Sequence, residues 1–215
     1  MSVFLLNDQL IFPPVKFADS DGLLAYGGDL SSERLLLAYR EGIFPWYNEP
    51  PALWWSPNPR FVLFPNEIKI SASMKQVFKK NLFTITFDKD FEGVIAGCKE
   101  AYRPGQAGTW ITSEVEAAYT KLHKEGYAHS VECWHNGELA GGFYGLQLGK
   151  CFFGESMFAR ISNASKAAFI TFVQRAQEEG IQIIDCQVYT EHLASLGAEF
   201  ISREEFITII KKYQD

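Results

Sequence analysis

Three runs of alternating side chains, joined by two short turns, constrain the fold of this chain more than any other stretch. The runs are Ala128 to His135, Glu138 to Leu148 and Cys151 to Phe158. Between them lie Asn136-Gly137 and Gly149-Lys150. Asn and Gly tolerate the positive φ angles of two-residue hairpin turns, so Asn-Gly between strand-like runs is the strongest short-range hairpin signal. We therefore expect an antiparallel sheet of three strands here.

Helical patterns surround this sheet. Ser113 and Glu116 have the spacing of a capping box, which predicts a helix start at that point. The expected helices are Ala72 to Lys80, Lys89 to Glu100, Ser113 to Glu125, Asn163 to Glu179, a short one near His192 and a last one from Arg203. Together with the hairpins they predict the α+β class, a mixed sheet with helices packed on it.

The first 65 residues have a different composition. They hold most of the nine prolines around one clear helix, Ser31 to Glu41, which Asp29 or Ser31 caps and Gly42 ends. We expect a small, loop-rich N-terminal domain over residues 1–65 and a mixed-sheet domain over residues 66–215.

Composition excludes several classes of protein. The chain has 215 residues, 47% of them hydrophobic, as in ordinary globular proteins. No apolar run approaches the roughly 20 residues of a membrane span, and Met1 to Leu10 lacks the features of a signal peptide. We expect a cytoplasmic protein. The four cysteines form no Cys-x-x-Cys pair, and His123, His129 and His135 lack helical metal spacing, so no metal site is expected.

The net charge of −6 argues against a protein that coats nucleic acid through bulk charge, although a local basic patch exists. Between Glu67 and Asp88 there are no acidic residues, and the segment contains Lys69, Lys75, Lys79 and Lys80. Charge patterning alone favours a solvated helix face for these lysines. Phosphate contacts are the alternative.

Two polar side chains interrupt the apolar run Ile183 to Val188. Side chains two apart on a strand point the same way, so Asp185 and Gln187 are expected on one face and Cys186 on the other. Burying unpaired polar groups costs a few kcal/mol, so the pair needs a partner or a ligand. On this geometry Cys186 is interpreted as an inert thiol and not as a nucleophile.

Glu155 lies within an aromatic strand, which is an unusual place for an unpaired carboxylate. Pairing with Arg160 or a lysine is the structural explanation. Because neither Glu155 nor Asp185 has a basic neighbour on its own strand, a shared cationic ligand would explain both acids. An acid pair for glycoside hydrolysis is a further possibility, although nothing else in the sequence indicates sugar chemistry.

Two tryptophans lie beside loop signals, Trp46 after Phe44-Pro45 and Trp110 after Gly108-Thr109. Most aromatic residues belong to a core, but an exposed indole can stack on a nucleic-acid base for roughly 1 to 3 kcal/mol.

Several ordered motifs together resemble the bacterial leucyl/phenylalanyl-tRNA protein transferase family, and the resemblance covers nearly the whole chain. The motifs are Leu23 to Leu30, Gly42 to Trp46, Trp54 to Pro57, Gly108 to Thr112, Gly154 to Phe158, Asn163 to Lys166, Asp185 to Gln187 and Ala194 to Ala198. The resemblance implies transfer of Leu, Phe or, less readily, Met from aminoacyl-tRNA to proteins that begin with Arg or Lys. This marks them for degradation in the N-degron pathway. It also implies an acetyltransferase-like (GNAT) fold in the larger domain, and no metal or small cofactor.

The same resemblance implies roles for individual residues. Asp185 and Gln187 would serve catalysis, and Glu155 with Asp185 would bind the basic residue of the acceptor. The chemistry of the two side chains leads us to expect that Asp185 accepts from the Gln187 amide. The aminoacyl-adenosine would contact Trp46, Trp110, Phe143, Phe152, Gly154, Met157, Phe169, Phe172 and Ile184. With tRNA as the expected donor, Lys75, Lys79 and Lys80 become candidate phosphate contacts.

Two rival functions remain at this point. A coenzyme A acetyltransferase would need a glycine-rich pyrophosphate loop, and residues Phe158 to Lys166 contain no glycine. A non-catalytic adaptor for basic N-termini would use Glu155 and Asp185 but would leave Gln187, Trp46 and Trp110 without a purpose. The adaptor predicts binding without transfer.

Overall fold

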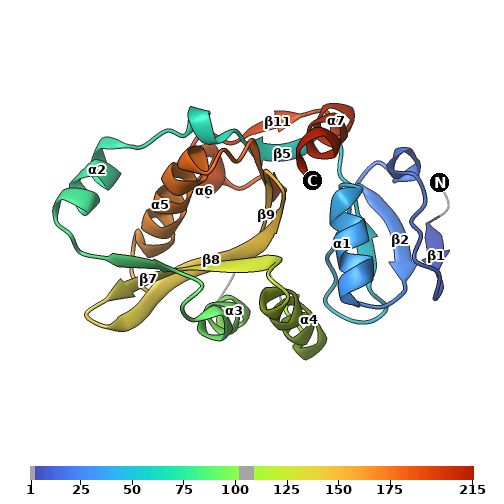
Figure 1. Cartoon of the computed structure of the whole chain (residues 1–215), viewed down its shortest axis with the longest axis horizontal. Helices are drawn as coiled ribbons and strands as arrows, with labels where there is room; N and C mark the ends of the chain where they lie inside the picture. Colours follow the sequence, from blue (N-terminus) through green and yellow to red (C-terminus); the bar gives the residue numbers. More distant parts are fainter. Residues whose placement is uncertain (1–2, 102–108) are drawn as a thin grey trace.

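The computed structural model describes residues 3–101 and 109–215. Two sheets make up the framework (Figure 1). The first has the order β1-β2-β4-β3, with β1 at Phe4–Leu6, β2 at Leu23–Gly27, β3 at Phe44–Pro45 and β4 at Leu53–Trp55. The helix α1 (Ser32–Arg40) accompanies it, and Ser31 caps that helix through its side chain, as the sequence predicts.

The second sheet has seven strands in the order β11-β5-β10-β9-β8-β7-β6. Their bounds are β5 Arg60–Leu63, β6 Thr84–Phe87, β7 Ala128–His135, β8 Glu138–Leu148, β9 Cys151–Ala159, β10 Ile183–Gln187 and β11 Glu199–Ile201. The two predicted hairpins are confirmed, since β7 pairs antiparallel with β8 and β8 with β9. The parallel pairing of β9 with β10 makes the sheet mixed and confirms the expected α+β class.

Helices cover both faces of this sheet (Figure 1). The helix α5 (Ala164–Glu178) packs on one face, where its apolar side joins Phe143, Phe152 and Ile184 in one hydrophobic cluster. The opposite face carries α3 (Phe91–Glu100), α4 (Ser113–Lys124) and α7 (Arg203–Tyr213). On that face the core continues without a break into residues of the first sheet, such as Leu24 and Trp54. Both sheets therefore share one hydrophobic core.

The remaining helical elements are short. They are η1 (Val15–Phe17), η2 (Pro65–Glu67), α2 (Ala72–Lys79) and α6 (Glu191–Ala194). The capping box expected at Ser113 is wrong by one residue, because the Thr112 side chain accepts from Val115 N–H and is the actual cap. None of the described helices has both the length and the apolarity needed to cross a membrane.

The domain boundary predicted at residue 65 stays a prediction. The first sheet ends at Trp55, and β5 (Arg60–Leu63) already belongs to the second sheet, where it lies between β10 and β11. The change from one sheet to the other thus falls between Trp55 and Arg60.

One irregularity in the second sheet determines where a site can form. The strands β9 and β10 pair only over Cys151 to Phe153 and Ile183 to Asp185, and no pairing follows beyond these residues. Both strands also carry an irregularity at this point, between Gly154 and Ser156 in β9 and between Asp185 and Gln187 in β10. Bulges bend strands and redirect side chains, and they are common beside active sites.

Candidate active site

A cavity of about 450 Å³ opens where β9 and β10 separate. Its walls include residues 154–159 of β9 and residues 184–188, which cover the end of β10 and the residue after it. Phe44 and Pro45 of β3 and the following Trp46 also line it. Most of the lining is apolar. The few polar side chains that reach it therefore have a strong influence on what can bind.

Glu155 is the residue that the β9 bulge leaves without a strand partner. Its Oε1 atom accepts from the Tyr39 hydroxyl at 2.6 Å and its Oε2 atom accepts from the Tyr119 hydroxyl at 3.0 Å. Tyr39 belongs to α1 and Tyr119 to α4, and their own hydroxyls lie 2.5 Å apart. Two elements far from β9 in sequence thus hold this carboxylate at the cavity wall.

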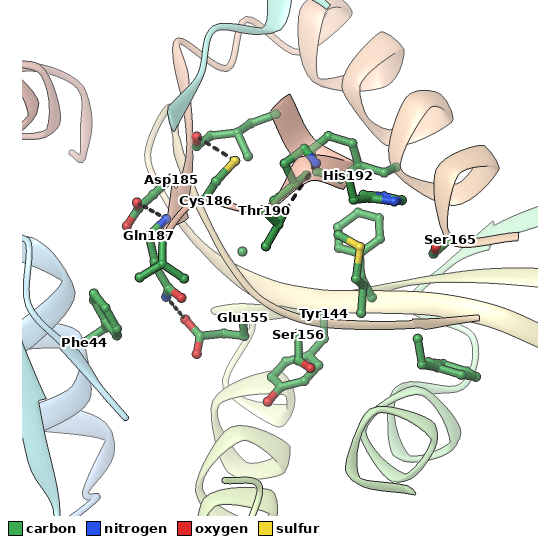
Figure 2. A pocket seen from close by; sticks show the side chains of 18 of the residues that line it. Phe44, Tyr144, Glu155, Ser156, Ser165, Asp185, Cys186, Gln187, Thr190 and His192 are labelled. Carbon is green, nitrogen blue, oxygen red and sulfur yellow. Dashed lines mark hydrogen bonds between the residues drawn. The ribbon is translucent and has the colours of Figure 1, made fainter. Parts of the chain in front are cut away.

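Gln187 faces Glu155 across the separation of the two strands (Figure 2). Its Nε2 atom donates to Glu155 Oε1 at 2.8 Å. The backbone of Gln187 has a φ of 63°, in the left-handed region that is uncommon for residues other than glycine. Such strain persists only where surrounding contacts enforce it, and it concentrates at functional sites.

Asp185 supplies one of these contacts. Its Oδ1 atom accepts from the backbone N–H of Gln187 at 2.9 Å. The same carboxylate forms a buried, bidentate ion pair with Arg60 of β5, at 2.8 Å from Nε to Oδ1 and 2.6 Å from Nη2 to Oδ2. The Arg60 guanidinium lies between the rings of Phe44 and Phe206, 4.7 and 4.6 Å from their centroids.

These contacts correct two expectations about Asp185. The side chain of Gln187 bonds to Glu155 and not to Asp185, so Asp185 orients Gln187 through the backbone. Asp185 also has a basic partner, Arg60, which the sequence conceals because it lies 125 residues away. Asp185 has no exposed surface and its charge is already balanced by Arg60, so a second cation has no access to it. The acceptor-binding role expected of both acids stays a prediction, and this geometry favours Glu155 for it.

Most of the predicted aminoacyl-adenosine residues do come together. Trp46, Trp110, Phe143, Gly154, Met157, Phe169 and Ile184 all line the cavity. Phe152 and Phe172 are not lining residues but support the wall, since their rings lie 6.2 and 5.3 Å from the ring of Phe143. The Phe143 and Phe169 rings meet edge to face, with centroids 5.5 Å apart.

The two tryptophans differ in exposure. Trp46 is 40% exposed at the rim of the cavity, as expected for a stacking platform, and its ring contacts Trp55 edge to face at 5.9 Å. Trp110 is only 9% exposed, so the expectation of an exposed indole is wrong for this residue. It still lines the cavity. Gly108, part of the same motif, lies outside the described residues.

Other sequence predictions lie away from the reacting groups. Lys75, Lys79 and Lys80 are exposed on and just after α2, and none of them lines the cavity. Cys186 touches the cavity but is buried, and burial raises the pKa of its thiol, as in an inert cysteine. Within the described residues no three His, Cys, Asp or Glu side chains gather as a metal site would require.

Sequence reasoning missed Arg60, Tyr39 and Tyr119. The only local signal for Arg60 is a charged residue at the start of the apolar run Phe61 to Leu63. The two tyrosines look like ordinary core residues of amphipathic helices, and only the tertiary structure brings their hydroxyls to Glu155.

Burial raises the pKa of Glu155 to about 8. The hydrogen bonds from Tyr39, Tyr119 and Gln187 act in the opposite direction, and the nearby charge of Asp185 adds to the increase. The free site is therefore ready to exchange a proton for a cationic ligand near neutral pH.

Over part of their length, solved structures with 11–12% identity are similar to the chain. The L-PGS of Bacillus licheniformis has a TM-score of 0.44, with 76% of this chain and 52% of that one covered. A GCN5-related N-acetyltransferase of Kribbella flavida has a TM-score of 0.40, with 78% and 60% covered.

The chain belongs to the leucyl/phenylalanyl-tRNA protein transferase family. The family's main model matches residues 62–211 and the model of its N-terminal domain matches residues 28–58. The leucyl/phenylalanyl-tRNA–protein transferase of Syntrophobacter fumaroxidans is 57% identical over 211 residues, which are 98% of this chain and 90% of the relative. That of Flavobacterium johnsoniae is 52% identical over 97% of this chain and 99% of the relative. The protein is thus an enzyme that acts on aminoacyl-tRNA and on protein substrates.

Replacing Arg60 tests the buried ion pair. We expect Arg60→Met to lower the free energy of unfolding by about 3–5 kcal/mol, because Asp185 would remain buried without its counter-charge. Urea denaturation measures the loss. The matched control is Arg175→Met, which breaks the exposed pair of Arg175 with Glu179 and should cost less than about 1 kcal/mol. Similar small losses in both variants would contradict a central role for the Arg60 pair.

The raised pKa of Glu155 predicts a pH dependence of stability. The ordinary pKa of this side chain is 4.5 and the folded value is about 8, so between these values the folded protein holds a proton that the unfolded chain has released. The free energy of unfolding should therefore fall from about pH 4.5 to about pH 8 and stay level above. Glu155→Gln should lose this contribution, whereas the exposed Glu178→Gln should retain it. If the free energy of unfolding changed with pH in the same way in the wild type and in Glu155→Gln, the contribution assigned to Glu155 would be disproved.

Proposed function

We propose that the protein transfers Leu or Phe, and less readily Met, from aminoacyl-tRNA to the α-amino group of proteins that begin with Arg or Lys. The product would carry a new N-terminal residue that acts as a degradation signal. One observation supports this most directly: Gln187 and Glu155 are hydrogen-bonded at 2.8 Å in a mostly apolar cavity that has an exposed tryptophan at its rim.

Glu155 is suited to select the acceptor. A carboxylate offers about four lone-pair positions, and the tyrosines and Gln187 use three of them. One position remains for an N–H of guanidinium or ammonium. An acidic or apolar first residue would leave Glu155 protonated at neutral pH and without a charge-assisted hydrogen bond, so the site discriminates for Arg and Lys.

Gln187 is suited to hold the reacting amine. When a cationic residue is bound, Glu155 is ionised and can only accept hydrogen bonds. The amide N–H₂ of Gln187 then faces Glu155, and its carbonyl oxygen is left to accept from the amine. The amine attacks the ester carbonyl, the new C–N bond forms, and the C–O bond to the ribose breaks. The proton lost by the amine goes to the ribose oxygen.

Positioning supplies most of the rate in this proposal. The α-amino group has an ordinary pKa near 7.7–8.0, so a useful fraction is unprotonated at neutral pH without a strong base. The ester is already activated, and well-oriented reactants reach effective molarities of roughly 10⁵ to 10⁸ M in the best cases. Asp185 contributes by holding the backbone of Gln187, and Arg60 holds Asp185.

The donor would occupy the other walls of the cavity. Trp46 and Trp110 would hold the terminal adenine, and the aromatic wall built on Phe143 and Phe169 would receive the transferred side chain. The tRNA body would extend beyond the cavity toward Lys75, Lys79 and Lys80. A cytoplasmic location, where charged tRNA is available, belongs to the same proposal.

A transfer assay tests this function. Leu-, Phe- and Met-tRNA are offered with peptides that begin with Arg, Lys, Asp or Met, and the extended peptides are detected by mass. We expect transfer only to Arg and Lys. Gln187→Ala should lower kcat by roughly 10²-fold, the low end of what lost positioning costs, with tRNA affinity nearly unchanged. Binding of basic peptides without transfer in the wild type would instead indicate an adaptor.

The lysines of α2 predict a salt dependence. Each of Lys75→Gln, Lys79→Gln and Lys80→Gln should reduce the slope of log K against log salt for tRNA binding by about one, because each phosphate contact releases a condensed counterion. Lys212→Gln, an exposed lysine near the end of α7, is the matched control and should leave the slope unchanged. Unchanged slopes in all four variants would return the α2 lysines to a solvated helix face.

A further inference from the structure

A patch of three aromatic rings lies beside the cavity and has no part in the chemistry described above. Tyr189 and Phe200 stack with centroids 6.0 Å apart and planes 19° apart, and both rings rest on Phe61, at 5.3 and 4.9 Å. Phe61 is buried, but Tyr189 is 54% exposed and Phe200 is 52% exposed. Contiguous exposed aromatic surface of this kind marks interaction sites more often than isolated apolar residues do.

The patch is continuous with the reaction site. In the sheet register Gln187 lies opposite Phe61 of β5, and Phe61 lies opposite Phe200 of β11. Val188, which follows Gln187, lines the cavity and is 42% exposed, and Thr190 on the other side of Tyr189 lines it as well. The cavity wall therefore continues directly into the patch.

We propose that Phe61, Tyr189 and Phe200 form an aromatic shelf that binds the acceptor polypeptide just after its first residue. This rests on the proposed function, which places the reacting amine at Gln187. Two strand spacings separate Gln187 from Phe200, about 10 Å in all, and an extended peptide advances about 3.3 Å per residue. The second to fourth residues of the acceptor would therefore cross the shelf.

The charges around the shelf favour a polypeptide over RNA. Residues 187–200 contain Glu191 and Glu199, both exposed, and no lysine or arginine. An RNA backbone would meet these carboxylates without counter-charges, whereas a peptide backbone is neutral. Aromatic rings can also stack on bases, so RNA binding is an outcome that the test must separate.

The shelf makes the enzyme sensitive to the acceptor sequence beyond its first residue. Apolar or aromatic side chains at the second to fourth positions would bury area against Tyr189 and Phe200, and acidic ones would face Glu191 and Glu199. Glycine and serine at these positions would bury little area against the rings and would not be repelled by the carboxylates.

The test compares three acceptors with Phe-tRNA as donor: an Arg-Phe-Leu-Ala peptide, an Arg-Gly-Ser-Gly peptide and arginine amide, which lacks the following residues. For the wild type we expect a KM about five- to twenty-fold lower for the apolar peptide than for the glycine peptide. Tyr189→Ser should remove that difference and leave the kinetics with arginine amide unchanged. Phe200→Ser should also reduce the difference. Phe17→Ser is the control: Phe17 is an exposed ring of η1, and its variant should keep the difference.

Several results would overturn the shelf. One is an equal KM for both peptides in the wild type, and another is an unchanged preference in Tyr189→Ser. A third is a loss of activity in Tyr189→Ser that is as large with arginine amide as with the peptides, which would indicate damage to the reaction site. A higher KM for Phe-tRNA with unchanged peptide values would assign the patch to RNA. If the wild type transfers nothing even to arginine amide, the proposed function itself fails. Transfer without a preference rejects the shelf alone.

Discussion

The buried ion pair between Arg60 and Asp185 is the interaction on which the site depends. It joins β5 to β10 at the point where β10 leaves β9, and the guanidinium is also enclosed by rings from β3 and α7. Asp185 then fixes the backbone of Gln187 in its left-handed conformation. Without that geometry the amide of Gln187 would not reach Glu155. A single charge pair therefore links the packing of four elements to the direction of one side chain.

The site can be understood as two bulges that face each other. Regular strands would direct side chains alternately to the two faces of the sheet, and neither Glu155 nor Gln187 could then span the separation between β9 and β10. The glycine at position 145 shows how tightly this region is built, since a Cβ there would lie 2.3 Å from the carbonyl oxygen of Phe153. The close approach of β8 to β9 and the bulge at Glu155 occur at the same level of the sheet.

The sequence allowed some of this to be predicted, for clear physical reasons. The long strands of the second sheet and the helices packed on it have enough residues to show a repeating pattern of apolar side chains. The hairpins at Asn136 and Gly149 and the helices around them could therefore be located. The strands of the first sheet have two to five residues each, which is too few for alternation to appear. Asp185, Gln187 and Glu155 stood out as polar residues in apolar strands. Their partners did not, because Arg60, Tyr39 and Tyr119 come from distant segments and their contacts arise only from tertiary packing.

The walls of the cavity come from both sheets, and this has a consequence for the shape of the cavity. Phe44 and Pro45 belong to the first sheet, Trp46 follows its strand β3, Tyr39 belongs to its helix, and Glu155 and Gln187 belong to the second sheet. Neither sheet supplies all of these residues. The cavity therefore depends on how the two sheets pack against each other, so a substitution at their contact can change its shape without replacing any residue of its lining.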